Sequence, residues 1–189
     1  MKKLLTVPNL LTALRIAGAL ALIWIEPLSA LFFVIYTISG VSDALDGPIA
    51  RATGSASELG ARLDSAADLL FYVVMMLRIL PELVRRLPGW IWYWVGAILA
   101  LRVAVYVTAA LRFRRFAALH TYFNKLTGLA VFLVPYFTLG AALTEYCIAV
   151  CVVGSLSSTE EWLLHLTAKR YDPERKTLLP VAAGKRAEK

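Results

Sequence analysis

Four aspartates, arranged in two pairs, are the residues of this chain whose types and spacing best suit chemistry. Asp43 and Asp46 are three positions apart, and Asp64 and Asp68 are four apart, so each pair shares one face of a helix. They lie in an apolar sequence, where an ionised acid costs roughly 2.5 to 3.5 kcal/mol to insert into a membrane. Four neighbouring acids therefore need cations. Carboxylate oxygens favour Mg²⁺, Mn²⁺ or Ca²⁺ over zinc.

Two divalent cations about 3.5 to 4 Å apart suit an in-line displacement at phosphorus. The metals neutralise the phosphates, and a remaining carboxylate takes the proton of the attacking hydroxyl. Arg51 follows the first pair and is placed to bind a phosphate oxygen. Small residues between the acids let the two helices that carry them approach closely as antiparallel neighbours. The residues predict phosphoryl chemistry on a membrane substrate.

Two other interpretations of the acids stay open at this point. Acids inside membrane helices often have a structural role as ion-pair partners, and Arg51 and Arg62 are near enough to pair with some of the four. Two arginines do not neutralise four carboxylates, which argues against a purely structural role. A divalent-cation transporter would use the same acids as an ion path.

The elements that must position the aspartates are predicted to be transmembrane helices. Of the 189 residues, 59% are hydrophobic and 17% are charged, a balance typical of an all-α polytopic membrane protein. We expect an N-terminal interfacial segment, one membrane domain over residues 1–168 and a charged tail over 169–189. Runs long enough to cross a core of about 30 Å fall at residues 10–25, 28–49, 61–80, 89–111, 126–144 and 146–166.

The basic residues predict the orientation of these spans. With the N-terminus inside, sixteen Lys and Arg residues, Arg15 among them, fall in the inside segments, and the outer loops hold only Arg78, Arg85 and Arg86. This bias follows the positive-inside rule and places the aspartates at the cytoplasmic face. The net charge of +7 is then explained by topology and anionic lipid headgroups, not by nucleic acid. Cys147 and Cys151 lie one helical turn apart and are expected to be packing residues.

Residues 43–68 resemble the motif of the class I CDP-alcohol phosphatidyltransferase family, D-x2-D-G-x2-A-R-x8-G-x3-D-x3-D, at every one of its specified positions. The six expected helices and the opening P8-N9-x-x-T12 extend the resemblance over most of the chain. The resemblance implies transfer of a phosphatidyl group from CDP-diacylglycerol to an alcohol, with release of CMP, in phospholipid biosynthesis. It also implies a homodimer, and we expect the plasma membrane of a prokaryote. A catalytically idle relative that senses CDP-lipid is a further alternative.

The resemblance also implies a role for each matching position. Two divalent cations, Mg²⁺ or Mn²⁺, would bind the four aspartates, and Asp68 would also be the general base. Gly47 and Gly60 would let the nucleotide approach the backbone, and Arg51 would bind a phosphate. The residues implied to contact the CDP-lipid are Asn9, Thr12, Asp43, Gly47, Ala50, Arg51, Ser57 and Gly60.

The acceptor alcohol is expected to be bound by Arg102, His120, Lys125 and Thr127. Lys125 and Thr127 loosely resemble the G-K-x-K-T element of phosphatidylglycerophosphate synthases, although Asn124 replaces its glycine and Thr127 its second lysine. Val103 also stands where those enzymes often have an acid. The expected acceptor is glycerol 3-phosphate, with inositol phosphate, serine and phosphatidylglycerol as alternatives within the same class.

Overall fold

The structure is a computed structural model that describes residues 6–53, 58–113 and 121–167. Within helices, the side chains at positions 47, 50, 51, 58, 59, 61 and 113 are outside this description. The chain divides into two compact units, Met1–Arg86 and Leu87–Lys189, and each is described by itself. The tail expected over residues 169–189 lies outside the described residues.

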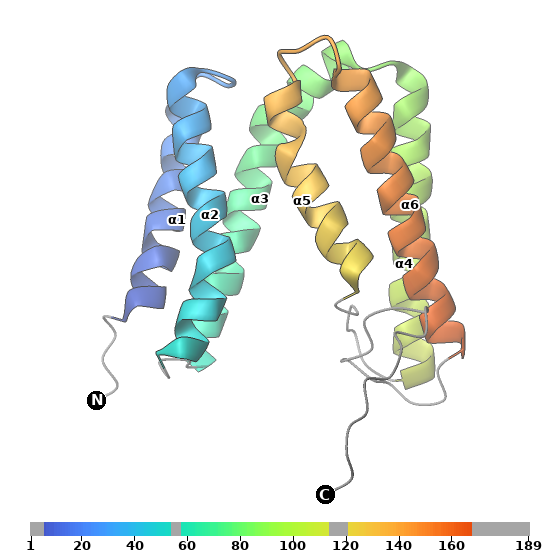
Figure 1. Ribbon diagram of the computed structural model, residues 1–189, viewed down its shortest axis with the longest axis horizontal. Helices are drawn as coiled ribbons and strands as arrows, with labels where there is room; N and C mark the ends of the chain where they lie inside the picture. The colour runs from blue at the N-terminus through green and yellow to red at the C-terminus, as the bar shows by residue number, and fades with distance from the viewer. Residues whose placement is uncertain (1–5, 54–57, 114–120, 168–189) are drawn as a thin grey trace, which may run out of the picture. The chain divides into compact units, whose positions relative to one another are not determined.

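The first unit consists of α1 (Val7–Trp24), α2 (Ala30–Ala52) and α3 (Glu58–Arg86) (Figure 1). Thr6 caps the N-terminus of α1, where its hydroxyl accepts a 3.4 Å hydrogen bond from the Asn9 amide. Pro8 occupies the first turn, where its missing N–H costs nothing. In α2 the helix continues past Pro48 to Ala52. The aspartates therefore stand on two continuous helices.

Helix α1 packs against both α2 and α3. Gly18 provides the close approach to α2, because a Cβ atom at this position would lie 2.4 Å from the Ser39 Oγ. The buried face of α1 is made by Thr12, Arg15, Ala19 and Leu22. The small residues on the two aspartate helices predicted a close approach of α2 to α3. In the described residues α1 instead packs closely against both α2 and α3. Its Gly18 leaves room for the Ser39 side chain of α2, while α2 and α3 meet through large rings such as Tyr36 and Phe71.

The second unit consists of α4 (Gly89–Phe113), α5 (Tyr122–Phe137) and α6 (Leu143–Thr167). Helix α6 packs against both α4 and α5. Two indole hydrogen bonds join α4 and α6: Trp94 Nε1 donates to Ser155 Oγ at 3.0 Å, and Trp162 Nε1 donates to Thr108 Oγ1 at 3.2 Å. Cys147 and Cys151 are buried and free, which confirms their expected role as packing residues.

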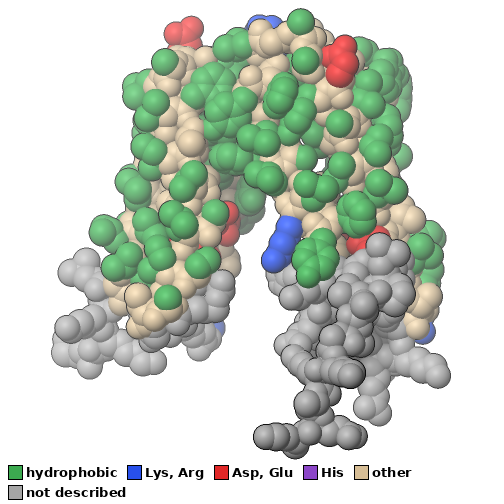
Figure 2. Space-filling view, viewed as in Figure 1, with side chains coloured by type: hydrophobic (Ala, Val, Ile, Leu, Met, Phe, Trp, Pro, Cys, Tyr) green, Lys and Arg blue, Asp and Glu red, His purple; other side chains and the backbone are tan. Residues whose placement is uncertain are grey.

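The predicted all-α fold with six helices is confirmed over the described residues. Three of these helices, α1, α4 and α6, are long and apolar enough to cross a membrane by length and composition. Hydrophobic side chains are also spread widely over the described helices on the face seen in Figure 2, as suits an integral membrane protein. Helix α1 is unbroken from Val7, so no turn separates the expected interfacial segment from the first span.

Helix α5 differs from its predicted bounds. It was expected over residues 126–144 and instead covers Tyr122–Phe137. The Thr121 hydroxyl starts the helix early by accepting a 3.1 Å hydrogen bond from the Asn124 amide. Turns at residues 138–142 then end it before the apolar run is finished. Capping and turn geometry decided these boundaries, whereas the prediction rested on hydrophobicity alone.

Candidate metal and phosphotransfer site

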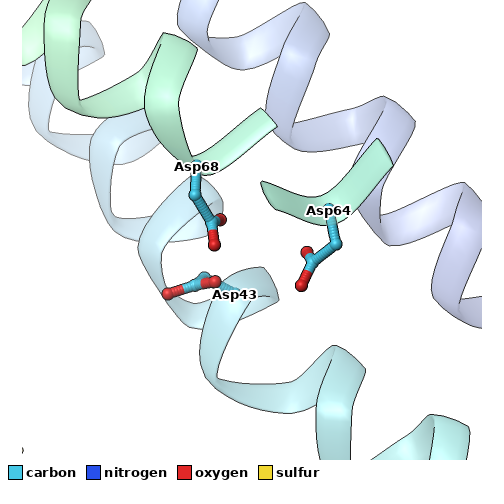
Figure 3. A group of neighbouring side chains, drawn as sticks. All are labelled: Asp43, Asp64 and Asp68. Atoms are coloured by element: carbon cyan, nitrogen blue, oxygen red, sulfur yellow. The ribbon is translucent and has the colours of Figure 1, made fainter. Parts of the chain in front are cut away.

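Three of the predicted metal ligands meet at one point of the first unit. Asp43 of α2 and Asp64 and Asp68 of α3 each offer a carboxylate oxygen, and these oxygens lie within 4.8 Å of one another. Figure 3 shows the three side chains pointing toward one another from the two helices. The convergence expected from the helical spacing is thus present in the structure. Asp46 joins the same group through Arg15, as described below; the four aspartates together are called the acid pocket.

The acid pocket has an accessible side and a buried side. The side chains of Asp43, Asp64 and Asp68 are 42%, 36% and 32% exposed. The Asp46 side chain is only 8% exposed. A small ligand can therefore reach three of the acids from outside the unit, while Asp46 forms the inner wall.

Arg15 of α1 lies in the middle of the acid pocket, and the sequence analysis missed this role. Its Nη1 atom lies 3.1 Å from Asp43 Oδ1 and 2.8 Å from Asp64 Oδ1. The same guanidinium also donates to Asp68 from Nη1 and to Asp46 from Nη2. Arg15 is fully buried. One cation on α1 therefore contacts all four carboxylates.

We had counted Arg15 among the basic residues that orient the chain. An available signal was its place in an apolar helix, because an arginine inside such a helix needs an acidic partner or a polar cavity. Its spacing from Thr12, Ala19 and Leu22 also puts it on the buried face of α1. The pairing with α3 joins residues 49 positions apart, and no local pattern predicts which acids it meets.

The chemistry of the acid pocket suits divalent cations. Four carboxylates and one guanidinium carry a formal charge of −3 when all are ionised. The donor atoms of the four acids are carboxylate oxygens, a type of ligand that Mg²⁺ and Mn²⁺ prefer. The convergence of all four acids on one cationic side chain indicates that they can close around a positive charge. The residues present therefore fit the metals that the sequence implied.

The other residues expected at the donor site are only partly described. Asn9 and Thr12 lie in the first turns of α1, where the buried Thr12 hydroxyl donates a 3.1 Å hydrogen bond to the Pro8 carbonyl. Gly60 lies in the first turn of α3. Ser57 lies outside the described residues. Gly47, Ala50 and Arg51 belong to α2, but their surroundings are outside the description.

The second unit holds a separate polar cluster, formed by Arg102, Asn124, Ser157 and Glu161. Arg102 Nη1 lies 3.0 Å from Glu161 Oε2, and its Nη2 donates to Asn124 Oδ1 at 2.7 Å. Asn124 Nδ2 donates to the same Glu161 oxygen at 2.9 Å, and the Ser157 hydroxyl donates to Asn124 Oδ1 at 2.6 Å. The cluster joins α4, α5 and α6. Ser157 was missed in the sequence.

This cluster includes one of the four residues expected to bind the acceptor. Arg102 takes part in it, with Glu161 as a counter-charge. Lys125 is exposed on α5, and the Thr127 hydroxyl donates a 2.8 Å hydrogen bond to the Phe123 carbonyl. His120 lies outside the described residues. Acceptor binding by these four residues stays a prediction.

Residues 5–156 match the CDP-alcohol phosphatidyltransferase family. The chain therefore belongs to this family, as its motif indicated. No solved structure matches the chain.

Several curated relatives are similar to part of the chain. A cardiolipin synthase (CMP-forming) of Streptomyces coelicolor is 39% identical over 77 residues, which cover 36% of each protein. A putative cardiolipin synthase of Mycobacterium tuberculosis is 37% identical over 107 residues, 54% of this chain and 48% of the relative. A CDP-diacylglycerol--serine O-phosphatidyltransferase of Methanocaldococcus jannaschii is 34% identical over 73 residues, 39% of this chain and 34% of the relative. The chain thus spans about half or less of the length of these relatives.

Proposed function

We propose that this protein transfers a phosphatidyl group from CDP-diacylglycerol to an alcohol and releases CMP. The observation that carries the proposal is the meeting of Asp43, Asp64 and Asp68, whose oxygens lie within 4.8 Å of one another. Family membership adds the substrate class, a CDP-linked alcohol. The apolar helices add a lipid setting for that substrate.

The acid pocket would hold two divalent cations, Mg²⁺ or Mn²⁺, through Asp43, Asp46, Asp64 and Asp68. When bound, such cations neutralise the donor pyrophosphate and orient it for displacement. The accessible side of the pocket suits this role, because three of the acids are at least 32% exposed. The donor would also contact Asn9, Thr12, Gly47, Ala50, Arg51, Ser57 and Gly60.

The protein's own residues would then accept the proton of the acceptor hydroxyl and bind the phosphate of CMP. The acceptor oxygen forms a bond to the phosphorus that carries diacylglycerol, and the bond from this phosphorus to the oxygen of CMP breaks. Asp68 accepts the proton of the acceptor hydroxyl as general base. Its position between buried Arg15 and the open side of the pocket supports this role. Arg51 binds the phosphate of the departing CMP.

Phosphatidylglycerol is the proposed acceptor. Two of the relatives are named as cardiolipin synthases, one of them CMP-forming. Cardiolipin carries two phosphatidyl groups on one glycerol, so a synthase that forms CMP adds the second group to phosphatidylglycerol. This choice differs from the acceptor favoured by the sequence alone.

Glycerol 3-phosphate is the second candidate acceptor. Lys125 and Thr127 favour it through their likeness to the G-K-x-K-T element. The counter-charge of Glu161 on Arg102 weighs against it, because a paired arginine has less attraction for a free phosphate. The panel of acceptors to be tested also includes inositol phosphate and serine. Serine is named in the Methanocaldococcus relative.

The test is CMP release by the purified full-length protein with CDP-diacylglycerol, Mg²⁺ or Mn²⁺, and each acceptor in turn. We expect the largest release with phosphatidylglycerol. Release only with glycerol 3-phosphate would leave the transferase proposal intact and replace the acceptor. No release with any acceptor, together with cation flux through liposomes, would identify the transporter instead. Donor binding without any turnover would identify the sensor.

The setting of the reaction is part of the proposal. We place the acid pocket at the cytoplasmic face of a prokaryotic plasma membrane, on the bias of basic residues in the loops. We also propose a homodimer, as the family resemblance implies. Cysteines introduced one at a time at Thr53 and at Glu26, beside the buried Cys147 and Cys151, test the orientation by labelling with a membrane-impermeant reagent. The Thr53 variant should react from the cytoplasmic side of sealed membranes and the Glu26 variant from the opposite side.

A further inference from the structure

Arg15 occupies the place to which the four aspartates point. Its guanidinium is fully buried and contacts Asp43, Asp46, Asp64 and Asp68. Its Nε atom is also buried and has no hydrogen-bond partner among the described residues. The two Nη groups therefore make all the described polar contacts of this side chain, and all of these contacts are with the acids.

The formal charge of the acid pocket disfavours binding Arg15 and two divalent cations at the same time. With Arg15 inside, the formal charge is −3, which two divalent cations would exceed by one. Without Arg15 the four carboxylates carry −4, which two divalent cations balance. Arg15 Nη1 also contacts all three of the acids that can share a metal. The guanidinium and the cations would thus use the same carboxylates.

We propose that Arg15 is a built-in competitor of divalent cations, which bridges the four carboxylates in the metal-free protein and leaves them when the cations bind. The inference rests on the divalent-cation site of the proposed function. In the metal-free state Arg15 relieves the repulsion between the acids and ties α1 to α2 and α3. The cost of moving it lowers the metal affinity of the wild-type protein, because binding and displacement are linked.

The test is the affinity of the full-length protein for Mn²⁺ in detergent micelles. The protein is first stripped of metal with a chelator, which is then removed, and free Mn²⁺ is measured by its electron paramagnetic resonance signal during titration. We expect Arg15→Gln to bind Mn²⁺ at least about tenfold more tightly than wild type, because the ion meets a more negative pocket and displaces nothing. Arg15→Lys, whose ammonium lacks the planar fork that bridges several carboxylates, should fall between them.

Stability gives a second readout that does not depend on activity. Arg15→Gln should lower the melting temperature of the metal-free protein, because four acids then lack their counter-charge, and Mn²⁺ should restore most of the loss. Arg78→Gln is the matched control. Arg78 is an arginine of the same unit that donates a 2.5 Å hydrogen bond to the Ile25 carbonyl, so its loss should leave Mn²⁺ affinity unchanged.

The outcomes separate the inference from the metal site on which it rests. If wild type binds Mn²⁺ and both Arg15 variants bind it with the same or lower affinity, the inference is overturned. Arg15 is then a supporting residue of the metal site. Absence of Mn²⁺ binding to every variant overturns the site and the inference together. If Arg15→Gln does not fold without metal, Arg15→Lys carries the affinity comparison.

Discussion

Arg15 of α1 donates a 2.8 Å hydrogen bond from Nη1 to Oδ1 of Asp64 on α3. The same guanidinium reaches both aspartates of α2, so the acid pocket is built by three helices and not by the aspartate helices alone. Close packing of α1 on α2 at Gly18 brings the arginine into place. The geometry of the pocket therefore depends on α1, which lies outside the 43–68 motif.

Asp68→Asn should abolish turnover while largely preserving binding of the CDP-lipid. The amide oxygen can still act as a ligand, but the side chain no longer accepts the acceptor's proton. Loss of a general base lowers the rate by about 10² to 10⁴-fold. CMP release and binding of CDP-diacylglycerol are to be measured on the same preparation. Turnover near the wild-type rate would remove Asp68 as the base.

Removal of divalent cations by chelation should stop CMP release without unfolding the protein. In the metal-free protein Arg15 neutralises part of the acid pocket and bridges all four of its carboxylates, so the helices should stay together. CMP release and the far-UV circular dichroism spectrum, recorded before and after chelation, check this expectation. Activity should return with Mg²⁺ or Mn²⁺. Full activity in the presence of the chelator would contradict metal dependence.

The sequence predicted the meeting of the acids because helical spacing and a short connection leave little freedom. Asp43 and Asp68 belong to neighbouring helices joined by residues 53–57, so their faces can meet near that connection. Arg15 was not predicted as part of the site because its partners are set by how α1 packs. That packing depends on Gly18 and Ser39, a contact between helices that no periodicity specifies.

In the second unit, too, the helices were predicted from the sequence but the contacts between them were not. The six helices followed from hydrophobicity, but the start of α5 depends on the Thr121 cap. The T-x-x-N spacing of this cap is visible in the sequence, yet a search for apolar runs passes over it. The cluster of Arg102, Asn124 and Glu161 joins residues as much as 59 positions apart. Its members were visible as polar residues in apolar helices, but their pairing was not.

Gly18→Ala should destabilise the first unit. The added Cβ would lie 2.4 Å from the Oγ of the buried Ser39, and overpacking of this kind costs about 1 to 3 kcal/mol. Gly96→Ala is the control, because nothing lies within 4 Å of its added Cβ and alanine favours a helix by about 0.5 to 1 kcal/mol. Thermal unfolding in micelles should move in opposite directions for the two variants. Equal melting temperatures would contradict the close approach at Gly18.

Glu161→Ala should destabilise the second unit by leaving Arg102 without its counter-charge. Removing one partner of a buried ion pair costs about 3 to 5 kcal/mol, and the partial exposure of Arg102 points to the lower end. Glu145→Ala on the same helix is the control, because Glu145 is exposed and should change the unfolding free energy by less than about 1 kcal/mol. Chemical unfolding in micelles compares them. A loss no larger for Glu161 than for Glu145 would mean that the cluster does not hold α4, α5 and α6 together.

The most direct test of the acid pocket is CMP release from CDP-diacylglycerol by Asp64→Asn and Glu82→Gln, measured beside wild type with phosphatidylglycerol and Mn²⁺. Both substitutions remove a carboxylate from α3, but Glu82 pairs with Arg85 and Arg86 at the far end of the helix. We predict that Asp64→Asn loses CMP release by at least about 10²-fold, since it removes a charge that holds the metals, while Glu82→Gln retains it. Equal activity of the two variants would contradict the assignment of the chemistry to the acid pocket.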